Sequence, residues 1–225
     1  MTRNLQRLIS GGFVVLGYNK YMEKDVRQAL DDIDTVNPFA TYLSDSTLSR
    51  VGGWIDTGSY VLNAIVSGSI HGGIPKGRVT MLAGESMTGK SLFVMKILAS
   101  AQKEGLIPVI FDTENAIDPE GAERLGLDVK NVKYVPCISI EQTRNALYKF
   151  LTTVKEKKLE GKFIIAIDSL GNLQSELSLA RMGKDSTSTD MGTNARAMKS
   201  LMQTCTNLGA VTQTTILCTN HVYDN

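Results

Sequence analysis

The chain has 225 residues, of which 42% are hydrophobic and 21% are charged, and its formal net charge is +1. This composition is typical of a globular protein with one substantial core, and it excludes a strongly basic protein that binds nucleic acid through its overall charge. The sequence contains no run of 18 apolar residues, which excludes a membrane-spanning helix.

The cysteines and the N-terminus indicate the compartment. Cys137, Cys205 and Cys218 stand far apart without CxxC spacing, which favours reduced, buried thiols over disulfides or a zinc site. The apolar run at residues 8–16 is interrupted by Ser-Gly-Gly at positions 10–12, and no small-residue cleavage site follows it. We therefore reject an export signal and expect a cytoplasmic protein.

The first predicted element is a short amphipathic helix over residues 21–34, where apolar residues recur at helical spacing before a break at Asn37-Pro38. Residues 35–55 are interpreted as a linker with the apolar side chains Phe39, Tyr42 and Trp54. These side chains either pack on the core or contact a neighbouring subunit.

A second helix begins at Thr57-Gly58-Ser59 and ends at Gly68, and residues 71–77 form a cluster of turn residues. A strand is expected over residues 79–83. The helix predicted over residues 92–102 is apolar on nearly every side, which indicates burial against a sheet.

Between that strand and that helix lies a glycine-containing loop of the form G-x-x-x-x-G-K-S. Its backbone N–H groups can curl around phosphate groups, and the positive end of the following helix points at the same place. Lysine at the seventh position can reach the β- and γ-phosphates, and serine at the eighth can ligate Mg²⁺. The predicted nucleotide-binding residues are Gly84, Glu85, Ser86, Met87, Thr88, Gly89, Lys90 and Ser91.

Strands and helices then alternate, which predicts an α/β fold with a mainly parallel sheet and right-handed crossovers. Asp118 followed by Pro119 predicts a helix start, and Ser139 with Gln142 has the spacing of a capping box. Residues 171–193 are predicted to form a long loop. The remaining predicted strands cover residues 108–111, 132–135, 163–167 and 215–219, and the remaining helix covers 195–208.

Three polar residues end predicted strands, where ligands of parallel sheets bind. Asp168 can support Mg²⁺. Glu114 either activates the water that attacks the γ-phosphate or caps the turn before the next helix. His221 either senses the γ-phosphate or simply faces solvent.

Several motifs in this order resemble the RecA family of strand-exchange ATPases. The run from Thr57 to Ser91, the segment FDTENAIDP, the run IDSLGNL and the strand end TNH all have counterparts there. The histidine of TNH and the SLGNL run are most similar to the phage recombinases of the family. The resemblance covers roughly residues 51–225.

The resemblance implies a RecA-like P-loop ATPase core over residues 51–225, preceded by a helix and linker over 1–50 that could contact another subunit. It implies ATP and Mg²⁺ as cofactors, with Lys90, Glu114 and His221 as catalytic residues. Asp118 would lie near the adenine base, and Ser91 and Asp168 would bind the metal. The implied strand order is phosphate loop, sensor, metal aspartate, Glu114 strand, then the strand at 132–135.

The resemblance also implies partners. These are single-stranded DNA, copies of the same chain in a helical filament, recombination mediators and single-strand-binding proteins, in a bacterial or phage-infected cell and without a membrane. The stretch from about Ser175 to Thr193 matches the first DNA-binding loop, where Arg181 and Lys184 either bind DNA phosphates or only keep the surface soluble. The second such loop would begin after His221, four residues before the last residue given, so we expect an incomplete domain whose phosphate-loop strand lacks one neighbour.

The function suggested is that of an ATP-dependent recombinase that pairs and exchanges DNA strands. Two other classes stay open. One is a different motor on the same fold, such as a helicase or a clock-type ATPase, which would form a ring. The other is a nucleotide-binding regulatory module that does not hydrolyse ATP.

Overall fold

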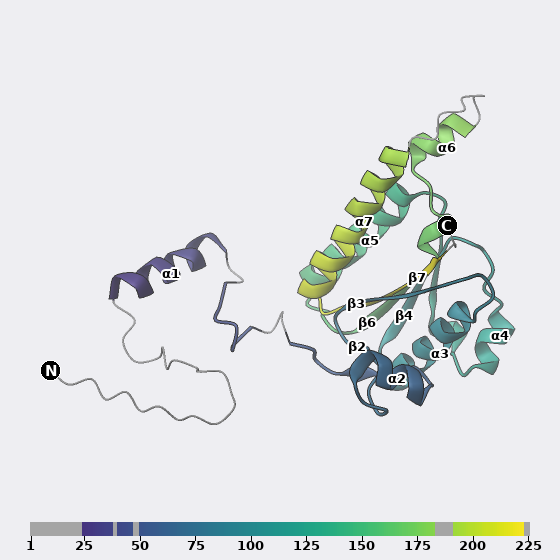
Figure 1. Ribbon diagram of the computed structural model, residues 1–225, viewed down its shortest axis with the longest axis horizontal. Helices are drawn as coiled ribbons and strands as arrows, with labels where there is room; N and C mark the ends of the chain where they lie inside the picture. The colour runs from purple at the N-terminus through teal and green to yellow at the C-terminus, as the bar shows by residue number, and fades with distance from the viewer. Residues whose placement is uncertain (1–23, 38–39, 47–49, 183–190, 223–225) are drawn as a thin grey trace, which may run out of the picture. The chain divides into compact units, whose positions relative to one another are not determined.

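The computed structural model describes residues 24–37, 40–46, 50–182 and 191–222. The chain divides into two compact units, residues 1–47 and residues 48–225 (Figure 1).

The first unit contains one described helix, α1 (Lys24–Val36). It ends one residue before Asn37, as the predicted break requires. Its apolar stripe consists of Val26, Leu30 and Ile33, whose side chains are 40–52% exposed. The helix predicted over residues 21–34 is confirmed from Lys24 onward, while residues 21–23 and Phe39 lie outside the described residues.

The second unit is built on a five-stranded parallel sheet with the order β3-β7-β6-β4-β5. This is the strand order that the family resemblance implied. The strands are β3 (Val79–Gly84), β4 (Ile107–Asp112), β5 (Lys133–Pro136), β6 (Phe163–Asp168) and β7 (Thr215–His221). Among the described residues, β3 pairs with β7 on one side and with no strand on the other.

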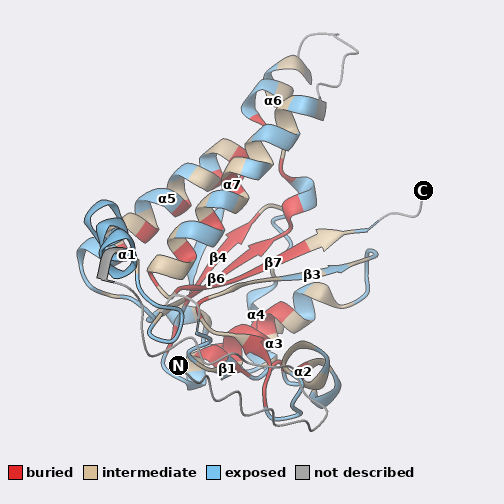
Figure 2. Cartoon of the chain, turned by 60° about the vertical axis from the view of Figure 1, so that its left-hand side comes forward, coloured by how far each residue is buried: buried red, intermediate tan, exposed pale blue. Residues whose placement is uncertain are grey.

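Helices cover both faces of this sheet, as Figures 1 and 2 show. One face carries α3 and α4, and the other carries α5 and α7. The helices of this unit are α2 (Tyr60–Ser67), α3 (Lys90–Lys103), α4 (Pro119–Arg124), α5 (Ile140–Glu156), α6 (Glu176–Met182) and α7 (Met191–Val211), with 3₁₀ turns η1 (Val129–Asn131) and η2 (Leu170–Asn172).

The central strands are buried on both faces of the sheet, because their successive side chains point alternately to one helical layer and to the other. On β4, Ile110 packs with α3 and α4, whereas Val109 and Phe111 pack with α5 and α7. Successive side chains of a strand point to opposite faces, so a strand between two helical layers must be apolar throughout. The central strands are red in Figure 2 for this reason, and edge strand β3 is more exposed.

The sequence-predicted helix ends are confirmed by their hydrogen bonds. Asp118 accepts hydrogen bonds from the backbone N–H groups of Glu120 and Gly121 at the start of α4. Ser139 accepts one from the N–H of Gln142 at the start of α5. Gly68 ends α2 with a positive φ of 75°, which a glycine adopts without strain.

The linker and turn predictions need one correction. Strands β1 (Trp54–Ile55) and β2 (Ile74–Pro75) form a two-stranded antiparallel sheet. Each strand has only two residues, which is too short for an alternating pattern to be recognised. Ile55 and Ile74 are fully buried in the core under α3, so the pair closes that part of the core.

The predicted loop over residues 171–193 is also partly wrong. The structure places η2 at its start, α6 in its middle, and the first residues of α7 at its end. Ile140 donates its N–H to the carbonyl of Gln174, and Ser175 donates its N–H to the side chain of Asn194. These bonds from α5 and α7 support α6, a seven-residue helix that would be marginal alone.

All three cysteines are free and buried, as predicted. Burial raises the pKa of each thiol, to about 12 for Cys205. Since the reactive form is the thiolate, these groups are inert packing residues.

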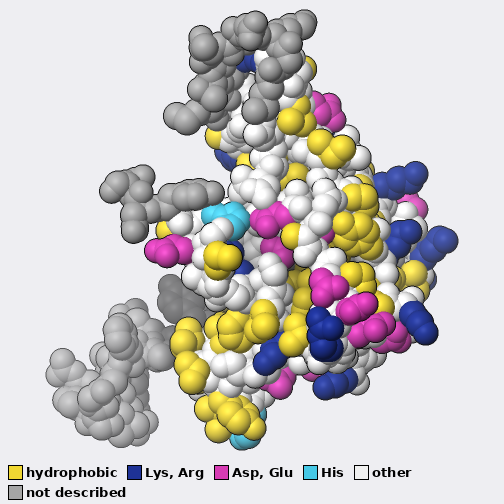
Figure 3. Space-filling view, turned by 90° about the vertical axis from the view of Figure 1, so that its right-hand side faces the viewer, with side chains coloured by type: hydrophobic (Ala, Val, Ile, Leu, Met, Phe, Trp, Pro, Cys, Tyr) yellow, Lys and Arg dark blue, Asp and Glu magenta, His cyan; other side chains and the backbone are white. Residues whose placement is uncertain are grey.

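The surface of the second unit carries exposed apolar side chains on α2, where Tyr60, Val61 and Ile65 are each at least 70% exposed. Figure 3 shows hydrophobic side chains gathered at the bottom of one face, and basic and acidic side chains interspersed above them. None of the described helices is long and apolar enough to cross a membrane.

Candidate functional site

The polar strand ends predicted from the sequence meet at one edge of the sheet. Because β3, β7, β6 and β4 are parallel, their carboxyl ends form a row. Gly84 lies opposite His221 in the register, and Asp168 lies opposite Asp112. The structure therefore brings the glycine loop, Asp168, Glu114 and His221 together.

The glycine loop joins β3 to α3, and its two glycines are needed for different reasons. Gly89 has a φ of 86°, a conformation that side chains disfavour. A Cβ atom on Gly84 would lie 3.1 Å from Oγ1 of Thr88. Between them, the Thr88 hydroxyl donates a 2.8 Å hydrogen bond to the carbonyl of Glu85, which closes the loop on itself.

Lys90 is the first residue of α3, and its ammonium group lies over the loop. The Nζ atom donates hydrogen bonds to the carbonyls of Gly84 at 3.0 Å and of Glu85 at 2.6 Å. The positive charge therefore stands at the end of the helix to which an anion is attracted. This is the place at which phosphate groups would be bound.

Ser91 and Asp168 line the same cavity. Asp168 is buried, and its Oδ1 accepts a hydrogen bond from the hydroxyl of Thr219 on β7. A hydroxyl and a carboxylate are oxygen ligands of the kind that Mg²⁺ takes, together with water and phosphate oxygens. Among the described residues, no group of three or more His, Cys, Asp or Glu side chains is arranged so that it could hold a metal ion.

Glu114 follows β4, and its carboxylate receives two hydrogen bonds. His221 Nε2 lies 3.1 Å from Oε1, and the hydroxyl of Ser169 donates to the same oxygen at 2.8 Å. Burial acts to raise the pKa of Glu114, but the hydrogen bonds from His221 and Ser169 and the nearby positive charge of Lys90 hold that pKa below its ordinary value. Glu114 is therefore a carboxylate at neutral pH.

The turn that carries Glu114 is fixed by Asp112. This buried carboxylate accepts hydrogen bonds from the backbone N–H groups of Glu114 and Asn115 at 2.9 Å through Oδ1. Its other oxygen accepts a hydrogen bond from the hydroxyl of Tyr134 at 3.1 Å. Burial and the hydrogen bond to Asp112 raise the pKa of Tyr134, so the phenol stays protonated and keeps donating.

Asp118 lies in the same cavity as Ser91 and Asp168, at the start of α4. Its two oxygens already cap that helix, and Arg124 Nη2 approaches Oδ2 to 3.4 Å. The structure therefore shows Asp118 as a helix cap within the cavity, and any contact to a base would have to share these oxygens. The cavity has a volume of about 320 Å³.

The predicted DNA-binding residue Arg181 does not line this cavity. Arg181 is half-buried in the last turn of α6, which projects beyond the end of the sheet in Figures 1 and 2. Lys184 lies outside the described residues.

Sequence reasoning missed Gly171, which joins the strand ends to α6. A Cβ atom on Gly171 would lie 3.0 Å from Oδ1 of Asn220 and 3.6 Å from Cδ2 of His221. The glycine therefore lets η2 lie directly against the end of β7. No helical or strand periodicity marks such a residue, since the need for it arises from the sheet order.

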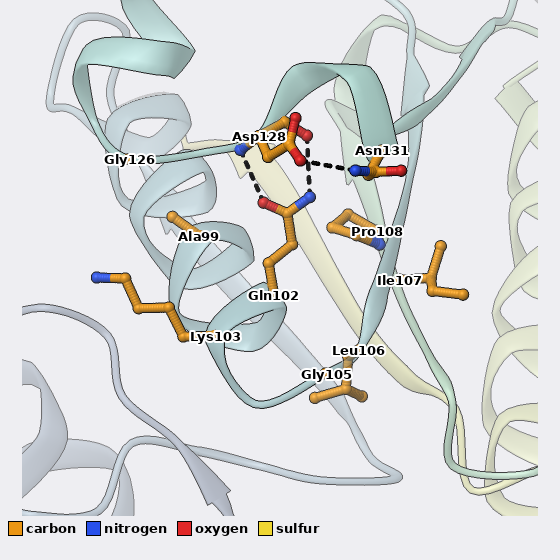
Figure 4. Close-up of a pocket in the computed structure, with 10 residues that line it drawn as sticks. All are labelled: Ala99, Gln102, Lys103, Gly105, Leu106, Ile107, Pro108, Gly126, Asp128 and Asn131. Atoms are coloured by element: carbon orange, nitrogen blue, oxygen red, sulfur yellow. Dashed lines mark hydrogen bonds between the residues drawn. The ribbon is translucent and has the colours of Figure 1, made fainter.

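A second hollow of about 430 Å³ lies at the opposite end of the sheet, where β4 begins (Figure 4). Three of its lining residues are joined by hydrogen bonds. Gln102 exchanges hydrogen bonds with the backbone of Asp128 at 3.0 and 2.8 Å, and Asn131 donates to the Asp128 carboxylate at 2.6 Å. These bonds join α3 to η1, so the polar residues of this hollow have a structural role.

The RecA N-terminal domain, as a protein-family model, matches residues 25–225. The chain belongs to the RecA family. The matched range includes the glycine loop, both strand-end carboxylates and His221.

Individual relatives agree with this assignment. The chain is 34% identical over 166 residues to Protein RecA of Chlorobium chlorochromatii, covering 73% of this chain and 42% of that protein. It is 30% identical over 166 residues to the Recombination and repair protein of Enterobacteria phage T4, covering 73% and 41%. The chain therefore matches about two fifths of the length of these relatives.

Proposed function

We propose that this chain binds ATP with Mg²⁺, hydrolyses it in response to single-stranded DNA, and acts in homologous pairing and strand exchange. The observation that carries the proposal is the row of strand ends, beside which Ser91, Glu114 and Asp168 line one cavity. The relatives are named as RecA proteins and a recombination and repair protein, which supports recombination over the helicase and regulatory-module alternatives.

The residues divide the chemistry between them. The loop from Gly84 to Ser91 holds the phosphates through backbone N–H groups, and Lys90 leaves the loop carbonyls to neutralise phosphate charge. Bound Mg²⁺ would supply charge stabilisation for the transferred phosphoryl group, held by Ser91 and Asp168.

Glu114 supplies the base. As a carboxylate fixed by Ser169 and His221, it can orient a water molecule and accept its proton. His221 connects this base to the end of β7, and through Gly171 to η2 and α6. We propose that DNA binds near α6, with Arg181 and Lys184 at its phosphates. The effect of DNA binding is then transmitted to the catalytic base Glu114 through this chain of contacts.

The first unit is proposed to contact a neighbouring copy in a helical filament. Support comes from the apolar stripe of α1, whose three side chains stay 40–52% exposed. Recombination mediators and single-strand-binding proteins are proposed as further partners on the family resemblance alone.

Binding measurements test the proposal. Fluorescent ATP should bind in the presence of Mg²⁺, and a labelled oligothymidine should bind more tightly with a slowly hydrolysed ATP analogue than without nucleotide. Binding of the oligonucleotide that is unaffected by nucleotide would argue for two independent sites and against a recombinase.

A further inference from the structure

Ser169 is the residue directly after β6, and it is fully buried. Since β6 lies between β7 and β4, the residue that follows it lies at the same edge of the sheet as His221 and Glu114. Its hydroxyl donates a 2.8 Å hydrogen bond to Oε1 of Glu114.

The position of Ser169 is fixed by Thr113, the residue before Glu114. The Thr113 hydroxyl accepts a hydrogen bond from the N–H of Ser169 at 2.9 Å and donates to the Ser169 carbonyl at 2.8 Å. The N–H of Thr113 also donates to the carbonyl of Asp168 at 2.9 Å. The turn that carries Glu114 and the turn that carries Ser169 are thus joined at three points.

Both side-chain hydrogen bonds that Glu114 receives from described residues fall on Oε1. The second oxygen, Oε2, is then the one that can accept a proton from water. The two donors differ in one respect. The role of a histidine ring nitrogen as donor or acceptor depends on its tautomer, whereas a serine hydroxyl can always donate. Ser169 therefore donates to the carboxylate in either tautomer of His221.

We propose that Ser169 is a positioning residue for Glu114, which fixes one carboxylate oxygen so that the other faces the attacking water. This inference rests on the proposed ATP hydrolysis. Ser169 acts through Glu114 and has no role in holding the nucleotide, so its removal should change turnover and leave nucleotide affinity intact.

The test compares S169A, S169T and the wild type, with T214V as the matched control. Thr214 is equally buried and loses a 2.8 Å hydroxyl contact with Thr212, but it precedes β7 at the opposite end of the sheet. We expect S169A to slow ATP turnover by about 10- to 100-fold, the effect of losing a hydrogen bond to a charged group. ATP affinity should stay within about twofold, and S169T should recover part of the rate because it keeps the hydroxyl.

A second readout does not need hydrolysis. The carboxyl ¹³C NMR signal of Glu114 should shift in S169A and stay unchanged in T214V. Wild-type turnover by S169A, or an unchanged Glu114 signal, would overturn the proposal. If the wild type itself does not hydrolyse ATP, the proposed function fails, and the NMR signal alone then decides whether Ser169 positions Glu114.

Discussion

Nε2 of His221 lies 3.1 Å from Oε1 of Glu114, although 107 residues separate them in the chain. His221 is the last residue of β7, and Glu114 follows the end of β4. These two strands are separated by β6. The side chains therefore meet across the end of the middle strand, and any movement of the β7 end acts directly on the proposed catalytic base.

Replacing Glu114 by glutamine should abolish the base while keeping the shape of the side chain. We expect E114Q to lower ATP turnover by about 10²- to 10⁴-fold, the usual contribution of a general base. ATP affinity should stay close to that of the wild type, measured by titration with a fluorescent analogue. E156Q is the control, since Glu156 is exposed at the end of α5. Equal turnover by E114Q and E156Q would show that Glu114 is not the base.

The lowered pKa of Glu114 predicts how stability depends on pH. A carboxyl group with a folded-state pKa below its unfolded value stabilises the fold above the unfolded value and stops doing so as pH falls through the folded value. The melting temperature of the wild type should therefore exceed that of E114Q at pH 7, and this difference should shrink as pH falls below about 4.5, the ordinary value. A difference that stays constant from pH 7 to pH 3 would contradict the assigned hydrogen bonds.

A methyl group on Gly171 should disturb the contact between η2 and the end of β7. The added Cβ would meet Oδ1 of Asn220 at 3.0 Å, so Asn220 or η2 must shift. We expect G171A to cost about 1 kcal/mol of unfolding free energy, at the low end for overpacking, and to weaken stimulation of ATP hydrolysis by DNA. G52A provides the comparison, since a Cβ there meets nothing within 4 Å. The result that would refute this coupling is G171A behaving like G52A in urea unfolding and in DNA stimulation.

Asp118 should matter for stability even without nucleotide. D118A removes the side chain that caps α4 through Glu120 and Gly121, and we expect a loss of about 1 kcal/mol in urea unfolding. D118N should retain most of this stability, because asparagine also caps helices well. If D118A unfolds at the same urea concentration as the wild type, the cap contributes nothing to stability. A contact between Asp118 and the adenine base would then be the better explanation for this residue.

Much of the fold was predictable because its determinants are local. Continuous apolar runs such as Phe163–Ile167 indicate strands buried on both faces, and Asp118-Pro119 indicates a helix start. The strand order did not follow from such patterns. It came from the family resemblance, and the sheet bears it out.

The missed helix α6 and the unnoticed Ser169 have a common physical cause, which is support from distant residues. Helix α6 has only seven residues, and it is held at Ser175 by Asn194 of α7, 19 positions away. Likewise, the contact of Ser169 with Glu114 can be recognised only once β6 is known to lie between β7 and β4. No helical or strand periodicity in the sequence marks residues of this kind. They can be found only after the structure shows the carboxyl ends of the parallel strands in one row.

The most direct test of the central claim is the rate of ATP hydrolysis by this chain with and without single-stranded DNA, measured beside the K90A variant. We predict hydrolysis that DNA stimulates and that K90A abolishes, because Lys90 is the cation above the glycine loop. A chain that hydrolyses ATP equally with and without DNA, or a K90A variant as active as the wild type, would contradict the proposed DNA-dependent ATPase.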